Sequence, residues 1–163
     1  MFAKVNSIGL FGMNAYEVGV ECAFAKGMSR FDMVGLPDAA VSESRNRVYS
    51  AIRNNGFFFP EGRMTVNLTP ADIRKEGSVY DLPVFVALLL ATNQLKAEVS
   101  DCAFIGELSL NGEVRKITGA LPMVIKAREL GIKEIYLPKD NAGESSVVKD
   151  IDIYPVESVM QLY

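Results

Sequence analysis

One stretch of sequence restricts the fold of this chain more than any other. Between Leu82 and Thr92 almost every residue is apolar, so a helix at this place has no polar face to turn toward water. The stretch is shorter than the ~18 apolar residues that a membrane-spanning helix needs. It predicts a helix from Asp81 to about Leu95, with Pro83 in its first turn, that other elements of the fold must bury.

The segments before this helix have the patterns of a sheet with one further helix. We expect strands at residues 4–11, 16–24, 31–36 and 65–68, the first two joined by a hairpin at residues 12–14. A helix is predicted from Asp38, which serves as its N-cap, to Asn55, and Gly56 is well placed to end it. The aromatic connector Phe57 to Phe59 is expected to pack into the core.

The segments after the apolar helix also alternate between strand and helix patterns. Asn111-Gly112 separates two strand patterns, 103–110 and 113–117, and is a strong hairpin signal. Further helices are expected at residues 120–130, 142–148 and 158–163, and further strands at 134–137 and 151–155. The mixture of hairpins and crossovers predicts a two-layer α/β (α+β) fold. With no linker or repeat in the sequence, residues 1–163 are interpreted as one domain.

Composition narrows the function and the location of the chain. Its net charge of −3 and pI near 5.1 argue against a strong nucleic-acid binder, which is usually basic. Arg45, Arg47 and Arg53 lie with Glu43 on the helix predicted from Asp38 to Asn55, and we interpret them as a solvated face of that helix. The chain begins without the apolar stretch of a secretory signal, so we expect a cytoplasmic protein with no membrane contact.

The residue types that are missing exclude several chemistries. The sequence has no His, so it offers no Ser-His-Asp or Cys-His machinery and no His ligand for a metal. No Gly is followed by Lys, so the phosphate-binding P-loop pattern is absent. Cys22 and Cys102 lie 80 residues apart and outside any CxxC pair, and we expect both to be buried core residues. We therefore expect no metal site.

Two glycine-bearing segments remain as candidates for a functional site. In the first, Lys75-Glu76-Gly77 leads into the apolar helix at Asp81, and free amides at such a place can hold an anion. The simpler interpretation, which we favour, is that Asp81 caps the helix and Gly77 provides a turn with positive φ. In the second segment, residues 106–122, a hairpin is followed by a helix that a glycine precedes. Its Glu107 and Glu113 are interpreted as solvated charges.

These two segments resemble parts of the Lon-type Ser-Lys proteases. Those enzymes have a Lys-Asp-Gly-Pro-Ser loop that opens a helix, then a TGE-x-x-L-x-G-x-V hairpin, and then a Gly pair and a Lys. In this chain the loop is similar to Lys75-Glu76-Gly77. The hairpin and the Gly pair are similar, in order, to Ile105-Gly106-Glu107, Leu110, Gly112, Val114 and Thr118-Gly119.

The resemblance also shows that both catalytic positions have changed. In its register the nucleophile position falls on Val79 and the lysine position on Leu121, and neither side chain can transfer a proton. We therefore expect no catalytic residues in this chain. A shifted dyad would need Ser78 with Lys116 or Lys126, and the hydroxyl would have to lie within ~3 Å of its base.

A closer resemblance links the chain to the N-terminal domain of the ComM/YifB family of magnesium-chelatase-like AAA+ proteins. It is carried by VGLPDAAVSESRNRVYSAIRNNGFFFP at residues 34–60, VNLTPADIRKEGSVYDLP at 66–83 and FIGELSLNGEVRKITGALP at 104–122. The resemblance implies a fold like domain 2 of ribosomal protein S5 and like the Lon proteolytic domain. It also implies an accessory or assembly role beside an AAA+ ATPase domain that these residues do not contain.

The same resemblance sets out the expected partners and the alternatives. ATP and Mg are expected on the AAA+ domain, no cofactor on this chain, a homo-hexamer for the longer protein, and DNA as the ligand of a branch-migration helicase in natural transformation and recombination. The alternatives are a Ser-Lys peptidase with a shifted dyad, or a subunit of a true magnesium chelatase. For the accessory role we predict an interaction surface where the Lys75, Glu76, Gly77 and Asp81 loop meets the hairpin at Asn111.

Overall fold

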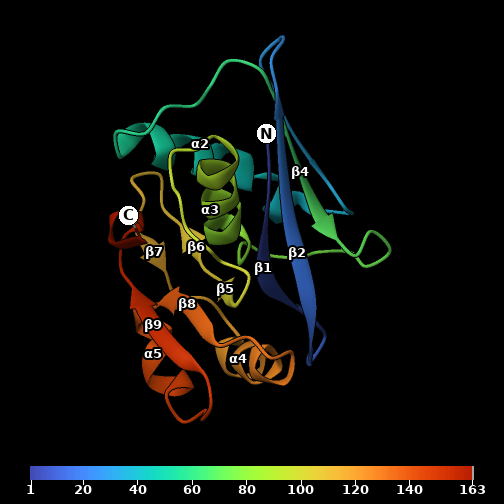
Figure 1. Ribbon diagram of the computed structural model, residues 1–163. Coiled ribbons are helices and arrows are strands. Elements are labelled where there is room, and N and C mark those ends of the chain that lie inside the picture. Colours follow the sequence, from blue (N-terminus) through green and yellow to red (C-terminus); the bar gives the residue numbers. More distant parts are fainter. Residues whose placement is uncertain (163) are drawn as a thin grey trace.

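A seven-stranded sheet runs through the computed structural model, which describes residues 1–162 (Figure 1). From one edge to the other its strands are β3 (Arg30–Val34), β4 (Arg63–Thr69), β2 (Asn14–Ala25), β1 (Phe2–Phe11), β5 (Cys102–Phe104), β8 (Glu134–Pro138) and β9 (Asp152–Val156). Strand β2 runs antiparallel to both of its neighbours, and the other four pairings are parallel. The predicted α/β class is therefore confirmed.

Helices and one small hairpin complete the fold. The helices are α1 (Ala39–Ser42), α2 (Ser44–Asn54), α3 (Asp81–Ala91), α4 (Ala120–Glu129), α5 (Lys139–Ser145) and the 3-10 turn η1 (Val159–Leu162). The hairpin consists of β6 (Glu107–Leu108) and β7 (Val114–Arg115), which pair only with each other in a separate two-stranded sheet. In Figure 1 the hairpin lies beside α3, and α4 and α5 lie toward the other end of the molecule.

Most predicted elements are present with shifted boundaries. The helix predicted from Asp38 is divided into α1 and α2 at Glu43. Glu43 stays in the helical region, with a φ of −66° and a ψ of −17°, and its carbonyl accepts the Asn46 amide three residues later at 3.0 Å. The Asp38 carboxylate caps α1 by accepting the Val41 amide at 2.7 Å, as predicted. The hairpin strands are much shorter than expected. The last predicted residue of the final turn, Tyr163, lies outside the described residues.

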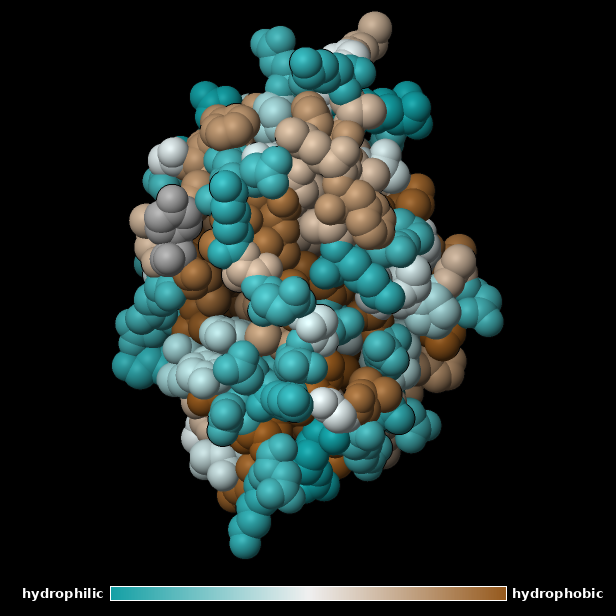
Figure 2. All heavy atoms as spheres, viewed as in Figure 1, coloured by the Kyte–Doolittle hydropathy of each residue, from teal (hydrophilic) through white to brown (hydrophobic). Residues whose placement is uncertain are grey.

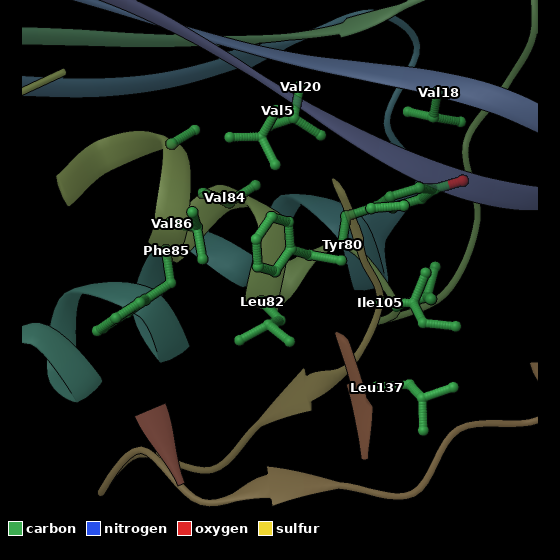
Figure 3. Close-up of a cluster of buried hydrophobic side chains, with 14 of the residues drawn as sticks. Val5, Val18, Val20, Tyr80, Leu82, Val84, Phe85, Val86, Ile105 and Leu137 are labelled. Atoms are coloured by element: carbon green, nitrogen blue, oxygen red, sulfur yellow. The ribbon is translucent and has the colours of Figure 1, made fainter. Parts of the chain in front are cut away.

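Helix α3 is the centre of the core, as its composition predicts. Every residue of α3 except Leu90 is buried. Val5 and Val20 are cross-strand partners on β1 and β2, and Figure 3 shows them facing the α3 residues Val84 and Val86. The sheet covers one side of α3 and the hairpin and α2 cover the others, so no polar face is needed.

The residue before α3 fixes how closely the helix approaches the sheet. The Tyr80 ring is buried and its hydroxyl points toward the strands (Figure 3). A Cβ atom on Gly9 of β1 would lie 2.2 Å from that hydroxyl oxygen, so only glycine leaves room for it. Burial raises the pKa of the Tyr80 hydroxyl, with the neighbouring Tyr16 hydroxyl adding to the rise. Tyr80 therefore stays neutral and acts as a packing residue.

The opposite face of β1 and β2 is covered over only part of its area. Ile8 and Leu10 alternate with the α3-facing residues of β1 and so point to the other side of the sheet. A Cβ atom on Gly119, directly before α4, would lie 2.4 Å from the Leu10 side chain, which places α4 on that side. In Figure 2 hydrophilic residues spread over the visible face of the molecule and hydrophobic residues show between them.

An ion pair in the interior joins α2 to the start of α3. The Arg47 guanidinium donates to both carboxylate oxygens of Asp81, Nε to Oδ2 at 2.6 Å and Nη2 to Oδ1 at 3.1 Å. Asp81 is fully buried and also accepts the Leu108 amide at 3.0 Å, and Arg47 donates to the Ala40 carbonyl at 2.9 Å. Helix α2, helix α3, the β6 hairpin and α1 are thus held together through two side chains.

This ion pair corrects two of the predictions. Asp81 does not cap α3, since the cap position is Tyr80 and the Asp81 carboxylate is turned to Arg47 instead. Arg47 is not part of a solvated face, since its side chain is only 18% exposed. Burial raises the pKa of the Asp81 carboxyl, while Arg47 and the Leu108 amide act against that rise. The hydrogen bond to Asp81 in turn raises the pKa of Arg47.

Asp81→Asn is expected to lower the free energy of unfolding by about 3 kcal/mol, because it leaves the Arg47 charge inside the protein without its partner. The double variant Arg47→Met with Asp81→Leu should lose less than this single variant, since it removes both charges. Urea unfolding measures both. As a control, Glu129→Gln breaks the exposed pair with Lys126 and should cost well under about 1 kcal/mol. An equal loss in the free energy of unfolding for Asp81→Asn and Glu129→Gln would contradict the structural role of the Arg47–Asp81 ion pair.

Both cysteines are expected to resist modification in the folded protein. Cys22 and Cys102 are free and buried, as predicted, and burial raises the pKa of each thiol to about 12. Since the thiolate is the reactive form, its fraction at pH 8 is on the order of 10⁻⁴. Ellman's reagent should react on the order of 1,000 times more slowly with the native chain than with the chain unfolded in guanidinium chloride, where about a tenth or more of an ordinary thiol is ionised at this pH. Rapid reaction of either cysteine in the native state would show that its site opens readily.

Candidate functional site

The two glycine-bearing segments meet at one cleft of about 470 Å³. We call it the Ser78 cleft. Three parts of the chain line it, namely the end of the first hairpin, the loop before α3 and the segment from β6 to α4. Its lining residues are Leu10, Gly12, Glu76, Gly77, Ser78, Val79, Glu107, Lys116, Ile117, Thr118 and Met123.

Backbone hydrogen bonds hold the loop against the segment that leads into the hairpin. The Gly106 amide donates to the Val79 carbonyl at 2.9 Å, and the Leu82 amide donates to the Gly106 carbonyl at 3.0 Å. A Cβ atom on Gly106 would lie 2.9 Å from a methyl group of Val114 and 3.5 Å from the Leu82 side chain, so the tight contact that favours glycine is the one inside the hairpin segment. The two segments that resemble Lon proteases are therefore adjacent in space, as expected.

The predicted interaction surface differs from the structure at its first residue. Lys75 is fully buried, and its Nζ donates to the Pro70 carbonyl. The Lys75 backbone also forms two hydrogen bonds with the segment before α1. Its amide donates to the Leu36 carbonyl and its carbonyl accepts the Asp38 amide, each at 2.9 Å. Burial lowers the pKa of the Lys75 amine. Lys75 is thus a structural residue of the loop, and the prediction that it lies on a surface is wrong.

One amide of the loop before α3 already has an acceptor within the protein. Gly77 has a φ of +85°, which confirms the predicted turn. Its amide donates to the Asp38 carboxylate at 3.2 Å, and the other oxygen of that carboxylate caps α1. The alternative in which free amides of this loop hold an anion therefore has a competitor within the protein, while Glu76 remains exposed beside it.

The hairpin tip lies away from the Ser78 cleft. The Asn55 side chain donates to the Asn111 carbonyl at 2.9 Å, and the Asn54 side chain donates to the Leu110 carbonyl at 2.9 Å. Asn111 is thus placed against the end of α2. The loop before α3 meets the hairpin at its first strand, through Asp81 and Leu108, so the predicted combination of that loop with Asn111 is wrong.

The two positions that correspond to the Lon dyad lie in different surroundings. Val79 is 7% exposed and lines the Ser78 cleft. Leu121 lies in the first turn of α4, is partly buried against the core, and does not line the cleft. Aliphatic side chains at both positions can exclude water but cannot carry a proton.

One observation supports the shifted dyad and another argues against it. Ser78 and Lys116 both line the cleft, so the fold brings together two residues that lie 38 positions apart. Between residues 1 and 162, however, no hydrogen bond joins the Ser78 hydroxyl to an amine, and Lys116 is exposed to solvent. Lys126 lies outside the cleft and pairs with Glu129 at 3.9 Å.

The described residues offer no other conventional centre for chemistry. Within residues 1–162 no three Cys, Asp or Glu side chains are grouped so that they could hold a metal ion. None of the helices in that range is both long and apolar enough to cross a membrane. Glu107 and Glu113 both line a second, highly polar groove beside the hairpin, together with Lys139 and Glu157, which form an exposed ion pair.

The sequence of α2 carries a signal for the interior ion pair. Ser44, Arg47, Val48 and Ala51 stand at positions i, i+3, i+4 and i+7, which puts them on one side of α2. All but Arg47 are fully buried, and an arginine on such a stripe needs a carboxylate partner. The double use of Asp38, which caps α1 and holds Gly77, has no comparable signal because Gly77 lies 39 residues after Asp38.

Comparisons with known proteins agree with this geometry. A family model described as subunit ChlI of Mg-chelatase matches residues 20–141. The uncharacterised protein YifB of Escherichia coli (strain K12) is 41% identical over 145 residues, which is 88% of this chain and 28% of that protein. Competence protein ComM of Haemophilus influenzae is 37% identical over 161 residues, which is 98% of this chain and 31% of that protein.

A more distant relative accounts for the two glycine-bearing segments. The Lon protease of Finegoldia magna is 26% identical over 155 residues, which is 91% of this chain and 20% of that enzyme. The chain thus spans less than a third of the length of each of these relatives. It belongs to the family described as subunit ChlI of Mg-chelatase and corresponds to the N-terminal, Lon-like domain of the ComM/YifB proteins in that family.

Proposed function

We propose that this chain is a non-catalytic accessory domain that assembles or guides an AAA+ ATPase of the ComM type. The observation that carries the proposal is that the loop and the hairpin segment still meet at the Ser78 cleft, while the position that corresponds to the nucleophile is Val79. The position that corresponds to the lysine is Leu121, which lies outside the cleft, so neither position offers a proton-transfer group. The sequence also has no P-loop, so ATP and Mg would bind a neighbouring domain.

The setting of this role follows from the relatives. The relative ComM is named a competence protein, which supports a cytoplasmic role in DNA uptake and recombination. The specific form of this role that we propose is branch migration by a homo-hexameric motor. The accessory domain would contribute an exposed surface and a rigid body to that assembly. Glu76 and Lys116 are the charged residues of the cleft best placed for such a contact, because both are exposed.

Two other functions compete with this proposal. The joint presence of Ser78 and Lys116 in the cleft favours a Ser-Lys peptidase with a shifted dyad. The description of the family favours a subunit of a magnesium chelatase, for which a porphyrin would be the ligand. Failure of the chain to change the absorption spectrum of protoporphyrin at micromolar concentrations would argue against the chelatase role for this domain.

The peptidase alternative is tested directly on the chain. We expect no cleavage of an unfolded protein substrate above the level seen with Ser78→Ala, because a hydroxyl without a base in bonding distance is a weak nucleophile. Gel electrophoresis over a day at pH 8 measures it, with Lys116→Met as the second variant. Cleavage that both substitutions abolish, in variants that unfold in urea like the parent, would establish a peptidase and exclude the accessory proposal as stated.

The accessory role is tested in a chimera of ComM in which this chain replaces the matching region. In the presence of ATP the chimera is expected to form the same assembly as unmodified ComM measured beside it. The double charge reversal Glu76→Lys with Lys116→Glu should weaken assembly by roughly tenfold in concentration, the size of a loss of ~1.4 kcal/mol at an interface. Analytical ultracentrifugation measures the assembly.

The matched control for that chimera is Glu17→Lys on the exposed part of β2, which should assemble normally. We avoid charge reversal at Lys75, because a buried lysine would unfold the loop and the loss would carry no information about a surface. Normal assembly of the Glu76→Lys, Lys116→Glu chimera would show that the Ser78 cleft is not the contact surface.

A further inference from the structure

A groove of about 540 Å³ with aromatic and arginine side chains lies between α2, the edge strand β3 and the segment after α2. We call it the arginine groove. Partly buried or half-exposed rings form its floor, and exposed guanidinium groups surround them. The residues that matter are Phe31, Tyr49 and Phe59 for the rings and Arg30, Arg45 and Arg53 for the charges.

The three rings form one continuous aromatic surface. The Phe59 ring lies 5.4 Å from that of Phe31 and 5.1 Å from that of Tyr49, both in tilted arrangements. Tyr49 is 43% exposed, so one part of its ring is open to a ligand while the other packs against Phe59. A ring fixed by its neighbours costs a ligand little conformational entropy when it stacks on the exposed part.

Helical spacing places two of the arginines on either side of that ring. Arg45, Tyr49 and Arg53 are four residues apart and therefore follow one stripe along α2. Arg45 is held by the carbonyls of Ser42 at 3.1 Å and Phe31 at 3.3 Å. The Arg53 guanidinium lies 5.9 Å from the centre of the Tyr49 ring and donates to its hydroxyl at 3.3 Å. Both guanidinium groups keep further N–H donors.

These two arginines carry charge that the protein does not neutralise. Among residues 1–162 neither Arg45 nor Arg53 forms an ion pair, whereas Arg30 pairs with Asp32 at 2.8 Å. Glu61 is the one carboxylate that lines the groove within that part of the chain. The groove is therefore positive on a chain whose net charge is −3, so it would attract an anionic polymer.

We propose that the arginine groove binds single-stranded nucleic acid, with phosphates on Arg45 and Arg53 and a base stacked on Tyr49. Rings open to stacking together with guanidinium groups along a groove are the combination that binds unpaired strands without regard to sequence. A duplex hides the faces of its bases, and an acidic peptide has no base to stack, so each would use only the charges. The proposal goes beyond the accessory role, because it places a nucleic-acid contact on this domain and not on the motor.

The sequence alone gives the opposite expectation for these arginines. They were interpreted as a solvated face because Glu43 lies among them and the chain is acidic. The rings that convert a charged helix face into a binding groove come from two other segments, β3 and the connector after Gly56. The prediction that the connector packs into the core is confirmed for Phe57, which packs against Phe85, and for Phe59, which packs against the core and also lines the groove. It is wrong for Phe58, which is exposed.

Fluorescence anisotropy with a labelled oligo-dT strand tests the proposal on the 163-residue chain at low salt. Arg45→Gln and Arg53→Gln should each weaken binding roughly tenfold and lower the slope of log K against log salt by about one. Tyr49→Leu should weaken binding at least about fivefold by removing the stacking ring, while Tyr49→Phe should bind nearly as the parent does.

The matched control is Arg128→Gln, since Arg128 lies in the last turn of α4 as Arg53 lies in the last turn of α2. It should bind oligo-dT like the parent. Equal weakening by Arg128→Gln, equal affinity of the parent for a blunt duplex or for poly-glutamate, or no binding at all would each overturn the proposal. The measurement contains no motor domain, so its failure would not contradict the accessory role. In the same way, failure of the ComM chimera to assemble would not contradict nucleic-acid binding by the arginine groove.

Discussion

The Arg47–Asp81 ion pair is the contact on which the position of the Ser78 cleft depends. Asp81 is the first residue of the buried helix α3. Its carboxylate accepts hydrogen bonds from the Arg47 side chain of α2 and from the Leu108 amide of the hairpin. The loop that lines the cleft ends directly at this residue. A charge pair inside a core is costly unless its hydrogen bonds are complete, and here the carboxylate has three donors. The loop that lines the cleft is therefore fixed by contacts in the core and not by any group inside the cleft.

The segments that correspond to the Lon loop and hairpin lie in contact in this chain. They are joined by the Val79–Gly106 and Leu82–Gly106 hydrogen bonds, which do not depend on the side chain of a nucleophile. The fold therefore tolerates valine at position 79. In the accessory role that we propose, the functional part of the domain is its surface, where the arginine groove and the Ser78 cleft are two of the hollows.

The elements of this fold could be predicted from sequence where a local pattern determines them. The apolar run of α3, the Asn111-Gly112 turn and the glycines at the helix ends are such cases. The site could not be predicted to the same extent, because its details depend on contacts between distant residues. Lys75 looked like an exposed charge, but Pro70, five residues earlier, accepts its amine inside the protein. Asp81 looked like a cap, and only the position of α2 shows that it has an arginine partner.

The Asp38 carboxylate links two segments that lie far apart in the sequence. One of its oxygens accepts the Val41 amide at the start of α1, and the other accepts the Gly77 amide in the loop beside the Ser78 cleft. The first turn of α1 and the wall of the cleft therefore share a single side chain. A substitution at position 38 would disturb both places at once, although only one of them lies at the cleft.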